Sequence, residues 1–153
     1  MLPPRVLVVW PERVPRALLR AELREAGYDA IGASSLAAAL RYPPAEPERG
    51  PVGLWIVDQA ALDAAAAPLL ALAATRHPVS RFLLVARAGP GAGTALAPPG
   101  GWQVVLRRPV TIGAVVDAAR TLVPLPPALQ RPIDRANAAG PAGPAGPASP
   151  GRR

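Results

Sequence analysis

Asp58 is the residue of this sequence best placed to do chemistry, because its carboxylate directly follows the apolar run 52–57. Other candidates also stand at the end of an apolar run or just beyond it: Trp10, Pro11, Glu12, Ala86, Arg87, Arg107, Arg108 and Pro109. If the runs are parallel strands, these residues gather at one edge of a sheet, where open α/β sheets hold ligands and reactive groups. A carboxylate there is a candidate reactive group, and an arginine beside it is a candidate ion-pair partner.

Several other kinds of site are excluded by residue type. The sequence has no cysteine, which excludes disulfides, thiolate nucleophiles and cysteine-ligated metals. His77 is the sole histidine, so we expect no histidine-rich metal site and interpret it as a helix C-cap or a surface residue. The stretch 89–93 lacks the Lys-Ser/Thr ending of a phosphate-binding loop, and Pro90 removes a backbone donor. We therefore expect no catalytic residue and no metal site, and we interpret 89–93 as a flexible loop.

The apolar runs predict the strands that would position these residues. Each run is apolar at consecutive positions, which is typical of strands that are covered on both faces of a parallel sheet. Four runs are clear and the second along the chain is weaker: 5–10, 29–33, 52–57, 81–86 and 102–107.

Helical segments separate the runs. The first is predicted from an apolar stripe at helical spacing, Val14, Ala17, Leu18 and Ala21, widened by Leu19, Leu23 and Ala26 and ended at Gly27. The last is predicted over 112–123 with Thr111 as its N-cap. Shorter helices are expected over 35–41 and 68–76. Between the last two strands, 88–101 contains five glycines and three prolines, which favours a loop or a single short turn.

Strands that alternate with helices predict a flavodoxin-like, doubly wound α/β fold with a five-stranded parallel sheet and a fourth helix that is short or absent. Proline and glycine are enriched from 124 onwards, with 8 and 4 in 30 residues. The sequence thus predicts an α/β domain over 1–123 and a disordered Pro/Ala/Gly-rich tail over 124–153.

The net charge of +7 comes from arginine alone, because lysine is absent. The arginines are scattered and do not alternate with aromatic residues, so coding bias explains them better than nucleic-acid binding does. The longest uncharged stretch in the apolar middle, 64–75, is too short to span a bilayer, and the N-terminus lacks the layout of a signal peptide. We expect a cytoplasmic protein with no membrane partner and no nucleic-acid partner.

Three motifs, in this order and spacing, resemble the receiver domain of bacterial two-component response regulators over residues 5–123. They are Leu23-Arg-Glu-Ala-Gly-Tyr28, Leu54-Trp-Ile-Val-Asp58 and Val105-Leu-Arg-Arg-Pro-Val-Thr111. The resemblance implies that Asp58 occupies the position that accepts a phosphoryl group with the help of Mg²⁺. It also implies that Arg108, before Pro109, replaces the family's lysine and pairs with a phosphoryl group or with Asp58.

Other positions depart from the family's pattern. The two acids that hold the cation fall on Trp10 and Pro11, which cannot ligate a metal, while Glu12 follows as a single carboxylate. The hydroxyl residue that contacts the phosphoryl group falls on Ala86. We also expect the Trp10 ring to fill the vacated pocket and to exclude water and metal.

These departures predict a degenerate receiver-like domain, or pseudo-receiver, with no cofactor and no enzymatic activity. It would act in two-component signal transduction or a phosphorelay by contacting a protein partner, a kinase or an effector. One alternative is a phosphorylatable single-domain response regulator with Asp58 as phosphoacceptor. Others are a small flavodoxin-like nucleotide-binding protein or enzyme, and a nucleic-acid or scaffold protein that acts through its arginine-containing tail.

Overall fold

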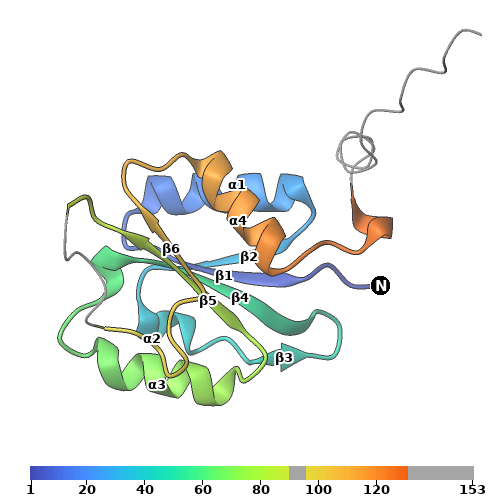
Figure 1. Ribbon diagram of the computed structural model, residues 1–153. Helices are drawn as coiled ribbons and strands as arrows, with labels where there is room; N and C mark the ends of the chain where they lie inside the picture. Colours follow the sequence, from blue (N-terminus) through green and yellow to red (C-terminus); the bar gives the residue numbers. More distant parts are fainter. Residues whose placement is uncertain (90–95, 131–153) are drawn as a thin grey trace, which may run out of the picture.

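A mostly parallel sheet forms the centre of the computed structural model, which describes residues 1–89 and 96–130 (Figure 1). The strands β1 (Arg5–Val9), β2 (Asp29–Ala33), β4 (Gly50–Asp58), β5 (Arg81–Ala86) and β6 (Val104–Arg107) lie in the order β2-β1-β4-β5-β6, and all of these pairings are parallel. This confirms the predicted doubly wound sheet. A two-residue strand that was not predicted, β3 (Ala45–Glu46), pairs antiparallel with the start of β4.

Helices cover both faces of the sheet. On one face lie α1 (Arg13–Ala26) and α4 (Ile112–Leu122), and on the other lie α2 (Leu36–Ala39) and α3 (Ala66–Arg76) (Figure 1). Short 3-10 turns follow β4 and α4, namely η1 (Gln59–Ala61) and η2 (Pro127–Leu129). Because both faces are covered, β1 and β5 are buried along nearly their whole length, as their continuous apolar runs predicted. No helix among these elements is long and apolar enough to cross a membrane.

The buried face of α1 differs from the predicted one. Val14 and Leu18 from the predicted stripe are exposed, at 68% and 52% of their surface, whereas Leu19 and Leu23 are buried against the sheet and α4. The residues predicted to widen the stripe, Leu19, Leu23 and Ala26, thus form the buried face, and the exposed Val14 and Leu18 lie outside it. The predicted end is confirmed: Gly27 has φ +113° and donates its N–H to the last turn.

The other helix ends follow their local chemistry. The hydroxyls of Ser35 and Thr111 accept hydrogen bonds from Ala38 N and Ala114 N at the starts of α2 and α4. The connection from β5 to β6 contains no helix over 87–89 and 96–103. The rest of the predicted loop, including most of 89–93, lies outside the described residues.

The core continues past residue 123. Leu125 is 7% exposed and belongs to the cluster shared by α1, α4 and the sheet. The hydroxyl of Tyr28 donates to the carbonyl of Val123 at 2.6 Å, and burial raises the pKa of Tyr28 to about 12. The division into a domain and a tail at 123 stays a prediction, and residues 131–153 of the predicted tail lie outside the described residues.

A network of charged side chains lies at the amino edge of the sheet around one buried arginine. Arg5 is fully buried, donates to the carbonyl of Gly50 at 3.1 Å, and lies 3.8 Å from the carboxylates of Asp29 and Glu46. Arg49 closes this network with two hydrogen bonds to Asp29 at 2.8 and 2.9 Å.

His77 lies near this network. It is the C-cap of α3, as predicted, but at 2% exposure it is no surface residue. Its ring packs edge-on against Trp55 with 5.0 Å between centroids, and neither ring nitrogen has a hydrogen-bond partner. Burial, together with the nearby guanidiniums of Arg76 and Arg5, lowers the pKa of His77.

Candidate functional site

Asp58 ends β4 at the carboxyl edge of the sheet. Its side chain is almost completely buried, because β4 lies between β1 and β5. Oδ1 accepts a hydrogen bond from Nη2 of Arg108 at 2.7 Å, and Oδ2 is buried with no hydrogen-bond partner. The structure thus brings together two predicted site residues that are 50 positions apart.

Arg108 reaches Asp58 from the loop between β6 and α4. Its backbone N–H donates to the carbonyl of Ala86 at 3.0 Å, which holds the loop against the end of β5. The peptide bond to Pro109 is cis. The guanidinium lies over the ring of Trp10, with its carbon 5.3 Å from the ring centroid, in the geometry of a cation–π contact. The Arg108 side chain is 39% exposed, so the pair is closed on the protein side and open to water on the other.

Trp10 occupies the first of the two positions that the resemblance assigns to metal-binding acids. Its side chain is buried, and its backbone N–H pairs with the carbonyl of Ala33 at the end of β2. Pro11 and Glu12 follow in the turn to α1. Glu12 is exposed, stands at the N-cap of α1 and makes no capping hydrogen bond through its side chain. Glu12 is thus separate from the Asp58–Arg108 pair.

Ala86 ends β5 beside Asp58 and is fully buried. Its methyl group offers no hydrogen bond to a ligand. Gln59 was not predicted as a site residue; its Oε1 accepts from the backbone N–H of Arg87 at 2.6 Å and ties the end of β4 to the end of β5. Its position directly after Asp58 was the available signal, because a polar residue there lies at the same edge as the candidates.

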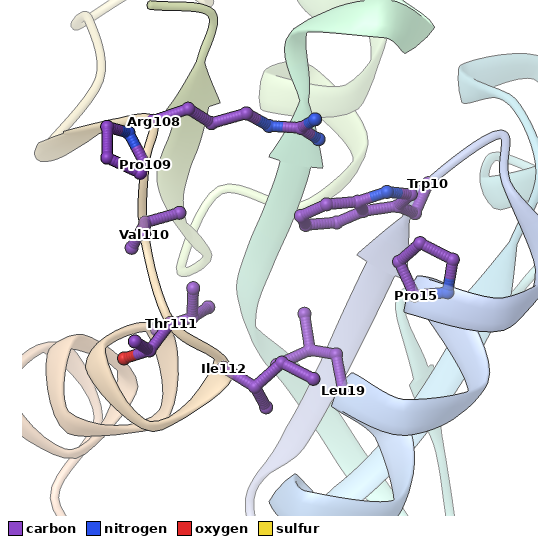
Figure 2. A pocket seen from close by; sticks show the side chains of 9 residues that line it. Trp10, Pro15, Leu19, Arg108, Pro109, Val110, Thr111 and Ile112 are labelled. Carbon is purple, nitrogen blue, oxygen red and sulfur yellow. The ribbon is translucent and has the colours of Figure 1, made fainter.

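A pocket of about 290 Å³ opens below Trp10 and Arg108 (Figure 2). Pro15 and Leu19 of α1 line one side, and the residues 109–112 line the other. Figure 2 shows the Trp10 ring above this space and the guanidinium of Arg108 extended across the end of β4. The pocket wall is mainly apolar side chains and one arginine, which are poor metal ligands.

The residues at this edge do not fit a divalent cation. Mg²⁺ requires several oxygen ligands in near-octahedral geometry, usually including one or two carboxylates. Here the neighbouring positions hold an indole and a proline, and one oxygen of Asp58 is taken by a guanidinium. Among the described residues, no group of three histidine, aspartate or glutamate side chains lies close enough to hold a metal ion.

Comparisons with known proteins find similarity in structure alone. No family model matches the sequence, and no curated protein matches it. A response regulator receiver domain protein from Clostridium thermocellum superposes with a TM-score of 0.63 at 20% identity, covering 78% of this chain and 94% of that one. A CheY-like receiver domain protein from Methanospirillum hungatei gives 0.63 at 18% identity, covering 78% and 92%. A receiver protein from Pseudomonas putida gives 0.60 at 21% identity, covering 79% and 98%.

The chain has the receiver fold. In this fold Asp58 ends β4, Ala86 ends β5 and Arg108 directly follows β6, so the three lie at one edge of the sheet. The similarity extends over at least nine-tenths of the length of each of these three neighbours.

Proposed function

We propose that this chain is a pseudo-receiver, a signalling domain that acts by contacting a protein partner and is not phosphorylated on Asp58 with Mg²⁺. The observation that carries the proposal is the 2.7 Å contact between Asp58 and Arg108 beneath which Trp10 is stacked. The receiver fold of its structural neighbours provides the signalling context.

The contact argues against phosphoryl transfer for an electrostatic reason. A carboxylate attacks a phosphoryl group only when a cation offsets the repulsion between the two negative charges, and that cation must bridge them. Arg108 neutralises Asp58 from one side, but within residues 1–89 and 96–130 no second acidic side chain joins Asp58 to bring in a divalent ion. Trp10 is buried at the position where the resemblance places the first metal-binding acid, so an indole stands there in place of a carboxylate.

The remaining positions support the same conclusion. Ala86 has no hydroxyl to contact a phosphoryl group, so a modified Asp58 would lack the hydrogen bond that couples it to the rest of the fold. Among the described residues, α1 presents Val14 and Leu18 to solvent, and these are the apolar side chains of that helix available to a protein partner. A protein partner, a kinase or an effector, is therefore part of the proposal, and so is the absence of enzymatic activity.

The test is incubation of the full chain with MgCl₂ and acetyl phosphate, followed by intact mass spectrometry. We expect no increase by the mass of one phosphoryl group. A mass increase that is lost in Asp58→Asn would overturn the proposal and would establish the alternative, a phosphorylatable response regulator.

A gain-of-function variant makes the negative result informative. Trp10→Asp, Pro11→Asp and Arg108→Lys together restore the residue types that the family uses around its aspartate. We expect this triple variant to acquire the phosphoryl group on Asp58, whereas the variant with Arg108→Lys alone does not. If Arg108→Lys alone became phosphorylated, the missing acids would not be the cause.

A further inference from the structure

Four arginines lie along β2 and the turn after α2, away from Asp58. Arg16, Arg20 and Arg24 follow one another at intervals of four residues on α1, so they project from the same side of the helix. Arg41 approaches from the turn after α2. Among the described residues, the ion pairs use Arg5, Arg49, Arg108 and Arg120, and none uses these four.

A cavity of about 380 Å³ lies between these elements. Arg16 lines it from α1, Gly32 and Ser34 from the end of β2, and Arg41 and Tyr42 from the turn after α2. None of the described residues that line it is acidic. Besides Ala33 and Ala38, the cavity is walled by two guanidiniums and the hydroxyl of Ser34, which can donate to an anion, and by the hydroxyl of Tyr42, which donates to the carbonyl of Gly32 at 3.4 Å.

Gly32 lets the arginines come this close to the sheet. A Cβ built on Gly32 would lie 2.6 Å from Cδ of Arg20 and 3.2 Å from Cδ of Arg16. The aliphatic parts of both arginines therefore lie directly on the backbone of β2, and their guanidiniums are held at its carboxyl end. A larger residue at position 32 would push both side chains away.

Not all of these guanidiniums have a role within the protein. Arg16 donates to the carbonyls of Trp10 and Pro11 at 2.7 and 3.2 Å, and Arg24 donates twice to the carbonyl of Ala30. Nε of Arg20 is buried and has no hydrogen-bond partner. Burial lowers the pKa of Arg20, and the charges of Arg24 and Arg16 lower it further, while Tyr42 acts in the opposite direction.

We propose that this cavity, lined by Arg16, Ser34, Arg41 and Tyr42 with Arg20 at its edge, binds the phosphate group of a small ligand. A phosphate offers the acceptor oxygens that planar guanidinium groups bind in pairs, and its negative charge offsets the repulsion among the arginines. The cavity has room for more than a phosphate ion, so a phosphomonoester such as a nucleotide fits it as well. This site is separate from Asp58 and does not depend on the pseudo-receiver proposal.

The test is isothermal titration calorimetry of the full chain with inorganic phosphate and with AMP, at constant ionic strength. We expect saturable binding of one ligand per chain. Tighter binding of AMP than of phosphate would assign the site to phosphomonoesters, and equal binding would assign it to free phosphate. The absence of saturable binding by either ligand would overturn the proposal.

Arginine variants separate the cavity from general attraction by a basic protein. Arg41→Gln changes an exposed side chain and is expected to weaken binding about tenfold or more, because it removes a charge-assisted contact with the ligand. Arg20→Gln is expected to weaken binding by a similar factor, because it removes a positive charge at the edge of the cavity. Arg81→Gln is the matched control, since it removes one positive charge from an exposed arginine at the amino end of β5. The affinity of this variant for the ligand should stay within about twofold of the wild-type affinity.

Two outcomes with these variants and with nucleic acid would overturn the proposal. Equal weakening by Arg81→Gln and Arg41→Gln would show that net charge alone attracts the ligand, and the proposal would fail. It would fail as well if a single-stranded oligonucleotide bound tightly with no dependence on Arg41, because the basic surface would then serve a nucleic acid. Urea unfolding of each variant verifies that its fold is intact.

Discussion

Arg108→Met tests how strongly the buried carboxylate of Asp58 depends on its partner. Methionine keeps an unbranched side chain that can pack on the Trp10 ring, and it removes only the guanidinium. The carboxylate, 2% exposed, then loses the single hydrogen bond that its two oxygens have in the described structure. The companion variant Asp58→Asn removes the negative charge and keeps an acceptor oxygen.

The burial of each partner sets the magnitudes. Removing one partner of a fully buried pair costs about 3–5 kcal/mol, and losing a hydrogen bond to a charged group costs about 1.5–3 kcal/mol. Arg108 is 39% exposed, so water enters part of the space, and we expect Arg108→Met to cost about 2.5 kcal/mol. Asp58→Asn should cost about 1 kcal/mol, because the neutral amide still accepts a hydrogen bond.

The double variant carries the decisive comparison. Without a charge at position 58, the loss of the guanidinium matters less, so the double variant should lose about 1.5 kcal/mol, less than Arg108→Met alone. Urea unfolding at pH 7, followed by tryptophan fluorescence and far-UV circular dichroism, measures all four free energies of unfolding.

A surface pair provides the control. Arg120 lies 3.5 Å from Asp117 on α4, with side chains that are 40% and 76% exposed. Arg120→Met should therefore cost at most about 1 kcal/mol. The reasoning is refuted if Arg108→Met costs no more than Arg120→Met, or if the double variant is less stable than Arg108→Met.

Two further predictions concern parts of the fold away from the pair. Because the pKa of His77 is lowered in the folded state, the unfolded chain takes up its proton first as the pH falls below about 6.5. As the pH falls from 7 to the lowered pKa, the free energy of unfolding of the wild type should therefore decrease relative to that of His77→Phe, by up to about 1.4 kcal/mol per pH unit. Urea titrations of both proteins across this range measure the difference, and two curves that stay parallel would contradict the prediction. Leu125→Ala should cost about 2–3 kcal/mol, because Leu125 is buried beside Gly27. A cost near that of an exposed Leu72→Ala would show instead that the core ends at residue 123.

The sheet could be predicted from the sequence because its strands are apolar at consecutive positions. The run from Arg81 to Ala86 matches β5 at both ends, and Asp29 to Ala33 matches β2. Once the strands are parallel, the carboxyl end of each lies at the same edge. That geometry explains why Asp58, Ala86 and Arg108 could be placed together without any knowledge of their contacts.

The orientation of α1 could not be predicted in the same way. The helix has two apolar rows, and both satisfy helical spacing. The row with Leu19 and Leu23 packs inside, whereas Val14 and Leu18 remain outside. The choice depends on the arginines at positions 16 and 20, whose aliphatic stems lie on β2, and such contacts are set by tertiary packing.

Buried polar residues were the other failure of the sequence analysis. His77 precedes a proline at a helix end, a position that is typical of the surface, yet the turn folds its ring against Trp55. Arg5 looked like the flank of a strand, and its burial depends on acids contributed by β2 and β3. The network could not be foreseen because β3 has only two residues.

The Asp58–Arg108 contact joins β4 to the loop after β6, and these two strands are separated by β5. A link across an intervening strand fixes the spacing of three strand ends at once. A pseudo-receiver held in this one arrangement would have no inactive population for a signal to convert. The fraction of partner that it occupied would then depend on its affinity and its concentration, so the cell would control it through how fast the chain is made and degraded.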